Sequence, residues 1–358
     1  MKNWKRKLAL MVCAALTAAS LTACASAPSA TNGEGGEKVL NIFTWADYFP
    51  QEVQDAFTEA TGIKINFSTF ESNEEMLMKL QAAKGGDYDI VLASDYIIDI
   101  ARKENLVGEL DKSQIPNFAN INPSYQSKFY DEQNQYTVPY AAGTPLIVYN
   151  KTLVDFPITG YEDLWNEKLK DSVVVMDDAR NVIGITLKTL GQSFNITDPA
   201  VLEQAKEKLL LLKPNIRALD YNNPQNLMIS GECAVGYMFT PQVVQAIAEN
   251  PDLEVVYPKE GMGFGIDACF VPANAPHKQN AYKWLDFILD GERSAAISEH
   301  DLYINCNSAA KAFLSQEYLD NKALYIPDEV LGDTEFIMDV GSDATELYND
   351  IWTAFKQS

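Results

Sequence analysis

Residues 38–67 have the sequence KVLNIFTWADYFPQEVQDAFTEATGIKINF, in which two kinds of hydrophobic periodicity alternate. The apolar run 39–43 is typical of a buried strand. A helical pattern then begins at Pro50 and ends at Gly62, and residues 63–67 alternate as a strand does. This order predicts two parallel strands joined by a helix that packs across them.

The same alternation continues towards the C-terminus. A second helix is predicted to begin at Asn73 and to stop at the glycine pair 85–86, and a short apolar strand at 90–93 ends at Ser94. The βαβαβ order is typical of an α/β protein whose mainly parallel sheet is covered by helices on both faces.

A second set of elements follows residue 142. Strands are expected at 146–149, 173–176, 234–238 and 253–257, and helices at the stretch ending at Leu190 and at 201–212. The apolar run 268–271 is expected to form a segment that returns to the first set of strands and helices. We therefore expect two lobes with a cleft between them. Lobe 1 would comprise 38–142 and a return segment of about 269–315, and lobe 2 would comprise 143–268 and C-terminal helices at about 316–358.

The N-terminus has the pattern of an export signal. Residues 1–23 contain four basic residues and then an apolar run, 8–19, that is too short to span a bilayer. Leu-Thr-Ala-Cys follows, which resembles a bacterial lipobox and predicts a lipid on Cys24. Cleavage of an ordinary signal peptide near Ala25 is the alternative. Residues 24–37 are rich in Ala, Ser and Gly and predict a flexible tether, so the protein is expected outside the cytoplasm and anchored to the cell membrane.

The composition excludes some partners. The net charge is −22, from 28 basic and 50 acidic residues, which argues against nucleic acid because phosphate binding needs clustered Lys and Arg. An acidic chain is compatible with a cationic ligand, although an acidic surface also keeps an exported protein soluble.

Catalytic and metal-binding signatures are missing from the sequence. His277 and His300, the only histidines, have no His or Cys partner at ligand spacing. The glycine-rich stretch 261–265 lacks the lysine of a phosphate-binding loop, and the adjacent acids 177–178 rarely point the same way. No enzyme activity, metal or cofactor is predicted.

Three cysteines remain beyond Cys24, at positions 233, 269 and 306. Each lies in or beside an apolar stretch, so buried free thiols are expected. One disulfide among them is left open, because spacing alone does not define a pair.

Aromatic and acidic residues recur after the predicted strands. An organic cation needs aromatic faces for its methylene chain and carboxylates for its ammonium groups. The residues that supply such a set are Trp45, Asp47, Tyr48, Tyr96, Asp178, Phe239, Asp267 and Tyr303.

Several segments in order along the chain resemble the polyamine-binding proteins of spermidine/putrescine ABC importers. They are NIFTWADYFP (41–50), TGIK (61–64), FESNE (70–74), YDIV (88–91), VPY (138–140), DDAR (177–180), PKEG (258–261) and VG (340–341). The resemblance extends from about Lys38 to the C-terminus. It implies a two-lobed type II periplasmic-binding-protein fold that closes by hinge motion on a polyamine in the cleft between the lobes. It also implies an ABC permease as partner and, as we expect, a monomer.

The resemblance also implies a set of ligand-binding residues. Positions that match the family pattern are Trp45, Asp47, Tyr48, Ser94, Tyr96, Asp178, Asp267 and Tyr303. Four positions depart from it: Asn181 replaces a Glu, Phe239 a Trp, Gly265 a Trp or Phe, and Ile337 a Gln. We retain Asn181 and Phe239 as ligand-binding residues, and Tyr237 or Phe264 are candidates to fill the space opposite Gly265.

These departures leave the choice of ligand open. A different small cationic or polar ligand of a protein with the same fold is the alternative to spermidine or putrescine. An enzyme acting on a sugar or peptide, and an adhesion or receptor-linked lipoprotein without ligand-induced closure, are alternatives from other functional classes.

Overall fold

The computed structural model describes residues 37–46, 48–332 and 334–358. The predicted signal peptide, Cys24 and the predicted tether up to residue 36 lie outside the described residues, as does Asp47. In the part of the chain that is described, no helix has the length and hydropathy needed to cross a membrane.

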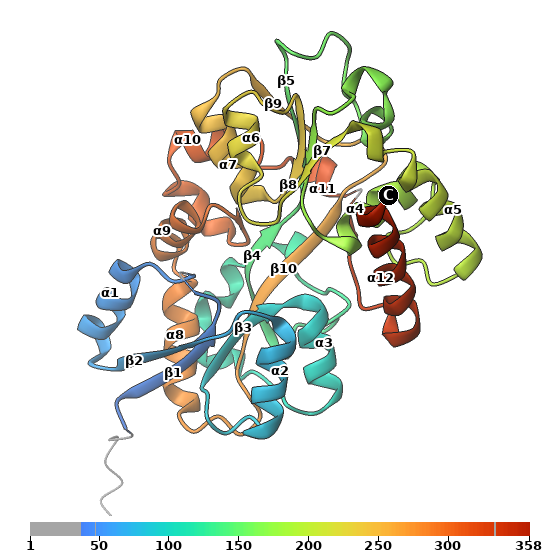
Figure 1. Cartoon of the computed structure of the whole chain (residues 1–358). Helices are drawn as coiled ribbons and strands as arrows, with labels where there is room; N and C mark the ends of the chain where they lie inside the picture. Colours follow the sequence, from blue (N-terminus) through green and yellow to red (C-terminus); the bar gives the residue numbers. More distant parts are fainter. Residues whose placement is uncertain (1–36, 47, 333) are drawn as a thin grey trace, which may run out of the picture. The chain divides into compact units, whose positions relative to one another are not determined.

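The first sheet has seven strands. It includes β1, β2 and β3, the three strands of the predicted βαβαβ unit (Figure 1). Its order is β11-β4-β10-β3-β1-β2, and β12 pairs with β10. The strands are β1 (Val39–Thr44), β2 (Lys64–Thr69), β3 (Ile90–Ser94), β4 (Thr137–Gly143), β10 (Gly263–Phe270), β11 (Ile304–Asn305) and β12 (Glu335–Phe336). β1 lies parallel to β2 and β3, whereas β10 runs antiparallel to β3 and β4.

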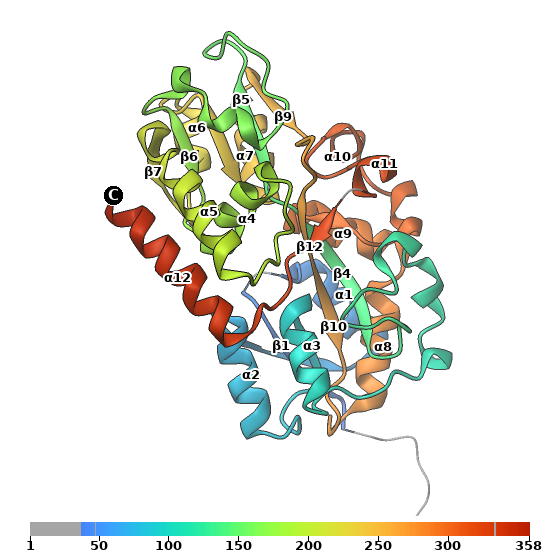
Figure 2. The ribbon, with the colours of Figure 1, turned by 90° about the vertical axis from the view of Figure 1, so that its right-hand side faces the viewer.

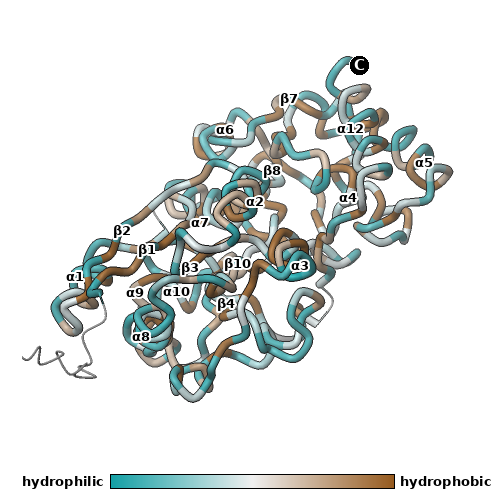
Figure 3. Tube along the Cα trace, turned by 90° about the horizontal axis from the view of Figure 1, so that it is seen from below, coloured by the Kyte–Doolittle hydropathy of each residue, from teal (hydrophilic) through white to brown (hydrophobic). Residues whose placement is uncertain are grey.

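Helices cover both faces of this sheet because neighbouring side chains of a strand point to opposite faces. On β3, Ile90 and Leu92 belong to one buried cluster, and Val91 and Ala93 belong to another. The first cluster includes residues of α1 (Gln51–Thr61), α8 (Lys278–Ile288) and α9 (Gly291–Asp301). The second includes residues of α2 (Asn73–Ala82) and α3 (Asp95–Lys103). The hydropathy-coloured trace shows brown stretches along the central strands and teal turns on α1 and α8 (Figure 3).

The second sheet has five strands in the order β7-β6-β8-β5-β9. They are β5 (Leu146–Asn150), β6 (Val173–Val175), β7 (Ile216–Leu219), β8 (Val235–Met238) and β9 (Leu253–Val256). β6 is parallel to β7 and β8, and β5 is antiparallel to β8 and β9. Both sheets are therefore mixed, and the expectation of a mainly parallel sheet is wrong, since strands that arrive by a crossover between the sheets enter antiparallel.

The helices of the second sheet come from the middle and the end of the chain. They are α4 (Ala179–Thr189), α5 (Pro199–Leu210), α6 (Gln225–Ile229), α7 (Thr240–Glu249) and the C-terminal α12 (Gly341–Gln357). Tyr348, Trp352 and Phe355 of α12 are buried in the same cluster as residues of α4 and α5. Figure 2 shows α12 beside α5 and α4, far along the chain from both.

Short elements complete the described chain. They are α10 (Gln316–Asp320), α11 (Asp328–Leu331) and the 3-10 turns Lys112–Gln114, Pro116–Asn120, Pro123–Tyr125, Tyr161–Trp165, Glu167–Leu169, Lys213–Asn215 and Ser308–Ala312.

Within the described residues, the chain passes between the two sheets after β4, before β10 and after β12. The first two passages are hydrogen-bonded to each other, because the Thr144 hydroxyl donates to the Gly263 carbonyl over 2.6 Å. The Thr240 hydroxyl at the start of α7 in turn donates to the Thr144 carbonyl over 2.8 Å. The passages next to the cleft are thus joined by side-chain hydrogen bonds.

Cys233, Cys269 and Cys306 are buried and free. The expectation of buried thiols is confirmed, and no disulfide forms among these three. Burial raises the pKa of Cys233 to about 11, so its thiol stays protonated near neutral pH.

Candidate ligand-binding site

A cavity of about 640 Å³ lies between the residues that follow the strands of the two sheets. Its lining on the first sheet comes from the segments after β1 and β3, from the start of α2, from the end of β4 and Pro145 beyond it, from β10 and from Tyr303. The opposite lining comes from the start of α4, from Tyr221 and Phe239, and from residues 337–349. Both halves of the chain therefore contribute to one concave surface, which is the usual form of a small-molecule site.

Asp267 is the acidic centre of the first-sheet side. Its Oδ2 accepts a hydrogen bond from the Tyr48 hydroxyl (2.6 Å) and its Oδ1 accepts one from the Ser94 hydroxyl (2.7 Å). Burial raises the pKa of Asp267, while these two donors act in the opposite direction. The carboxyl group is thus held in one orientation by two hydroxyl groups from different segments.

Aromatic rings line the same side of the cavity as this carboxyl group. The ring centroid of Tyr48 lies 5.9 Å from that of Tyr303 and 6.0 Å from that of Tyr140. Trp45 packs on Phe70 with a centroid separation of 4.4 Å, and its indole Nε1 is a buried atom without a hydrogen-bond partner. Burial raises the pKa of Tyr303 to about 12, so this hydroxyl remains neutral.

Tyr96 extends the wall at the start of α3. Its hydroxyl accepts a hydrogen bond from Asn73 Nδ2 (3.1 Å) and donates one to Glu74 Oε1 (3.0 Å). Ser72 caps α2 by accepting from the Glu75 backbone N–H, which fixes the first turn that carries Asn73 and Glu74. The Tyr96 ring is thereby placed by the N-terminus of a neighbouring helix.

Asp178 faces the cavity from the second sheet. It is the N-cap of α4, and its Oδ1 accepts from the backbone N–H of Asn181 (2.8 Å) and from Asn181 Nδ2 (3.1 Å). Asn181 is 93% buried, because its relative exposure is 7%, yet its Oδ1 has no hydrogen-bond partner. An unpaired acceptor in the wall of a cavity is a place where a ligand N–H can bind.

An aromatic pair completes that wall. Phe239 lies at the N-cap of α7, and its ring centroid is 5.8 Å from that of Tyr221. Both side chains line the cavity.

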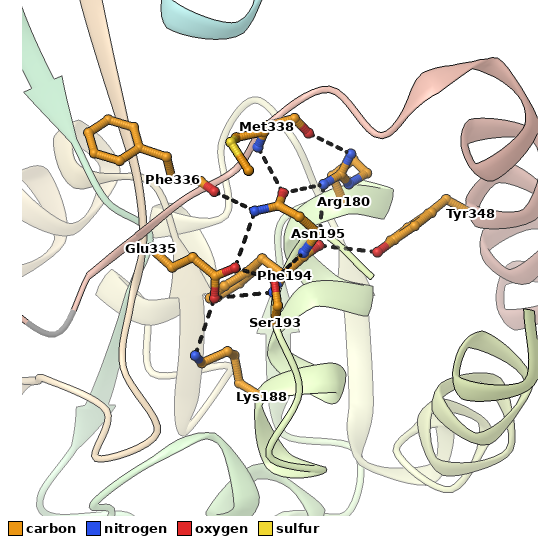
Figure 4. A network of polar contacts seen from close by, with 9 residues as sticks. All are labelled: Arg180, Lys188, Ser193, Phe194, Asn195, Glu335, Phe336, Met338 and Tyr348. Carbon is orange, nitrogen blue, oxygen red and sulfur yellow. Dashed lines mark hydrogen bonds and ion pairs between the residues drawn. The ribbon is translucent and has the colours of Figure 1, made fainter. Parts of the chain in front are cut away.

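The segment between β12 and α12 closes one side of the cavity, and a polar network holds it to the second sheet (Figure 4). Glu335 accepts hydrogen bonds from the Ser193 hydroxyl and from the Phe194 backbone N–H, and it pairs with Lys188 Nζ at 3.4 Å. Asn195 Oδ1 accepts from the Met338 backbone N–H (2.8 Å). The position of this segment is therefore fixed by groups at and beyond the C-terminal end of α4.

Arg180 joins the same network one residue from the start of α4. Its guanidinium donates to the Met338 carbonyl (3.1 Å) and to Asn195 Oδ1 (3.1 Å), and it lies 4.7 Å from the centre of the Tyr348 ring. These contacts connect the helix that presents Asp178 with the segment that enters α12.

The structure brings together all of the predicted ligand-binding residues that it describes. The cavity lining includes Trp45, Tyr48, Ser94, Tyr96, Asp178, Asn181, Phe239, Asp267 and Tyr303. Asp47 and Cys24 lie outside the described residues, and in the described part of the chain no cluster of acids, histidines or cysteines could hold a metal ion.

Neither candidate fills the space at Gly265. Phe264 lines the cavity but packs between Tyr125 and Phe336, with centroid separations of 6.2 and 5.8 Å. Tyr237 is fully buried in the core of the second sheet. The cavity therefore reaches the backbone at Gly265.

Other lining residues were not predicted. They are Asn73, Glu74, Asp95, Ala141, Ala142, Gly143, Pro145, Ala179, Arg180, Tyr221, Met338, Asp339, Thr345, Tyr348 and Asn349. Phe264, and the departing positions Gly265 and Ile337, also line the cavity. Asp95 lies between the predicted residues Ser94 and Tyr96, directly after β3. Its place at a strand end could have indicated that it lines the cavity. Nothing in the local sequence of Thr345, Tyr348 and Asn349 points to a cavity, because these residues reach it only through the position of α12.

Comparisons with known proteins agree with this architecture. Residues 52–325 match the family model described as bacterial extracellular solute-binding protein. The chain belongs to this family. It is a solute-binding protein that functions outside the cytoplasm, and not an enzyme.

Individual relatives cover nearly the whole chain. A spermidine/putrescine-binding periplasmic protein of Salmonella typhimurium is 37% identical over 99% of both chains. The protein of that name from Escherichia coli is 36% identical over the same share. The crystal structure of a spermidine/putrescine ABC transporter substrate-binding protein from Streptococcus pneumoniae has a TM-score of 0.82 and 34% identity, covering 89% of this chain and 98% of that one. The solute-binding fold with two lobes, expected from the resemblance, is thus confirmed.

Proposed function

We propose that this solute-binding protein captures a polyamine, spermidine or putrescine, and delivers it to the permease of an ABC importer. The names of the relatives support this proposal. So does a cavity whose opposite walls carry Asp267 and Asp178 among aromatic rings.

The carboxyl group of Asp267 is the observation that carries the proposal. It is held by two hydroxyl donors, and among the described residues no lysine or arginine forms an ion pair with it. Taking such a group out of water is costly unless a cation pairs with it. A ligand ammonium group supplies that cation and donates hydrogen bonds at the same time.

The remaining lining residues suit the carbon chain of a polyamine. Trp45, Tyr48 and Tyr303 on one wall and Phe239 on the other offer faces for methylene groups. A ring within about 6 Å of an ammonium group attracts it with about 0.5–2 kcal/mol. Ser94, Tyr96 and Asn181 add polar contacts, and Asp47 is proposed to belong to the same set.

A different small cationic or polar ligand is the second candidate. Asn181 provides an unpaired amide oxygen instead of a charge, and Gly265 leaves space in the wall. Both features change which ligand fits without changing the closing mechanism.

Isothermal titration of the purified chain with spermidine, putrescine, spermine and cadaverine tests the proposal. We expect one-to-one binding of at least one amine with a Kd near or below about 1 μM, or about −8 kcal/mol. No detectable binding of any of the four amines would contradict polyamine binding and favour a different small cationic or polar ligand.

We further propose that residues 1–23 are removed and that Cys24 carries the lipid that anchors the protein, as a monomer, to the membrane. Replacing Cys24 by Ser should release the protein from the membrane fraction, and mass spectrometry of the mature N-terminus should show acylation. An unmodified N-terminus near Ala25 would instead indicate an ordinary signal peptide.

The lobe boundaries are part of the same proposal. We propose that the seven-stranded sheet and the five-stranded sheet are the centres of lobes 1 and 2, and that the return to lobe 1 begins with β10. Limited proteolysis should cut first in the passages between the lobes.

A further inference from the structure

Asp95 is a buried carboxyl group that lies behind Gly265. A Cβ atom added at Gly265 would have Asp95 Oδ2 as its one neighbour within 4 Å, at 3.9 Å, apart from the residues adjacent in the chain. Both residues line the cavity, and Asp95 is only 3% exposed. The missing side chain of Gly265 thus leaves a recess at whose end the carboxyl group lies.

Backbone groups fix the orientation of this carboxyl group. Its Oδ2 accepts from the Ile266 N–H (3.0 Å) and its Oδ1 accepts from the Tyr96 N–H (2.7 Å). Each oxygen keeps a further lone pair, because a carboxylate has about four acceptor positions. In the described residues no lysine or arginine forms an ion pair with Asp95.

The titratable groups that face Asp95 are acidic or neutral. They are Asp267 on β10, Tyr130 before β4 and Tyr96 on α3. Tyr130 is fully buried and its hydroxyl has no hydrogen-bond partner. Among the described residues, the recess therefore holds a second carboxyl group beside Asp267 and no fixed cation, so an arriving cation is the group that would stabilise the charged form of Asp95.

The geometry points to Asp95 as a further ligand-binding carboxyl group, which receives a protonated amine through the recess that Gly265 opens. This inference rests on the proposed function and deepens it. It assigns an ammonium group of the ligand, and not a methylene segment, to the space beside Gly265. Ligands with a primary or secondary amine at that position are favoured over those with an uncharged group there.

Four variants of the full chain test the inference by isothermal titration with the best-binding amine. Asp95→Asn should weaken binding about tenfold or more, because it removes the charge that pairs with the ammonium group. Gly265→Phe should also weaken binding, since the ring would cover the recess. In the Gly265→Phe background, Asp95→Asn should have little further effect. Glu59→Gln, on the exposed side of α1, removes the same charge far from the cavity and should bind as the wild type does.

Two results would overturn this inference and leave the proposed function intact. They are wild-type affinity in a folded Asp95→Asn variant, and equal losses on Asp95→Asn with and without Gly265→Phe. If the wild type binds no amine at all, the proposed function fails together with the inference, and this outcome is distinct from both.

If the Asp95→Asn variant does not fold, the number of protons released on ligand binding tests the inference instead. Burial raises the pKa of Asp95 to about 8, so its carboxyl group is mostly protonated at pH 7 without ligand. An arriving ammonium group should expel this proton, and titration in two buffers of different ionisation enthalpy should give nearly one proton released per ligand. Gly265→Phe should abolish most of that release. No release from the wild type, or full release from Gly265→Phe, would count against the inference.

Discussion

At the scale of single residues, two carboxyl groups on the first-sheet side of the cleft are held in different ways. Asp267 is oriented by the side-chain hydroxyls of Tyr48 and Ser94, whereas Asp95 is oriented by backbone N–H groups. Burial raises the pKa of both. A residue held by hydroxyl groups is easier to test by substitution, because hydroxyl groups can rotate towards a replacement amide.

Asp267→Asn should lower the affinity for a polyamine by about 2–5 kcal/mol, because an ammonium group would lose its carboxylate in a cleft with little water. Titration calorimetry measures this loss, with Glu59→Gln as the control for net charge. Wild-type affinity in the Asp267→Asn variant would remove Asp267 from the binding site.

Asp95 should make the ligand-free protein less stable as the pH rises. Its folded-state pKa, about 8, lies above the ordinary value of 3.8, so between about pH 4 and 8 the folded state binds a proton that the unfolded state has lost. The contribution of Asp95 to the free energy of unfolding then falls by up to about 1.4 kcal/mol per pH unit. Urea unfolding at several pH values should show that the free energy of unfolding of the Asp95→Asn variant increases relative to that of the wild type as the pH rises. A constant difference between them would contradict the raised pKa.

At the scale of elements, the N-terminus of α4 combines two tasks in one side chain. Asp178 caps the helix through the Asn181 N–H, and it presents its carboxylate to the cavity. The anion also interacts favourably with the positive end of the helix dipole.

Substitutions at Asp178 should separate these tasks. Asp178→Ser keeps an N-cap acceptor and should leave the free energy of unfolding within about 0.5 kcal/mol of wild type while weakening polyamine binding. Asp178→Ala should weaken binding and also cost about 0.5–2 kcal/mol of stability. Parallel unfolding and titration experiments measure both effects, and full affinity in Asp178→Ser would exclude a role for this carboxylate in the ligand site.

The β12–α12 segment is held in part by one acidic side chain, Glu335. Removing Glu335 leaves the Ser193 hydroxyl and the Phe194 N–H without their acceptor, while Asn195 Nδ2 keeps its hydrogen bond to the Phe336 carbonyl. Glu335→Ala should therefore cost about 1–3 kcal/mol of stability and expose residues 334–340 to proteases. Glu346→Ala, at an exposed position of α12, is the matched control. Equal protease resistance in both variants would show that other contacts hold the segment.

At the scale of the whole molecule, the proposed mechanism is closure of two lobes around the ligand. The passages at Thr144 and Gly263 are joined by a short hydrogen bond, and a third passage follows β12. A few residues in such passages can absorb the change in backbone angles while both sheets stay rigid.

Small-angle X-ray scattering should show a smaller radius of gyration with saturating polyamine than without it. The Asp267→Asn variant at the same ligand concentration should stay close to the ligand-free value, since it binds more weakly. An unchanged radius for the saturated wild type would contradict hinge closure and would fit a lipoprotein that does not close on its ligand.

Much of this protein was determined by its sequence alone, wherever the signal is local. Strand and helix periods around 39–43 and 50–62 follow from the spacing of apolar residues, and Gly62 ends its helix in the left-handed conformation. Most of the predicted aromatic and acidic residues follow strands, and strand ends converge in an α/β protein, so the meeting of these residues in one cavity was predictable. Asp267 lies within β10 and Tyr303 directly precedes β11, so this argument does not cover them.

Only the tertiary structure decided the rest, because it depends on contacts between distant parts of the chain. The antiparallel entry of β10 beside β3, and the packing of α12 on α4 and α5, have no local signature. Asp95 and Gly265 are separated by 170 positions, and each alone is an ordinary residue at the end of, or within, a strand segment. The recess forms because β10 brings Gly265 next to Asp95. This proximity depends on how the strands pair and not on the residues that neighbour either one in sequence.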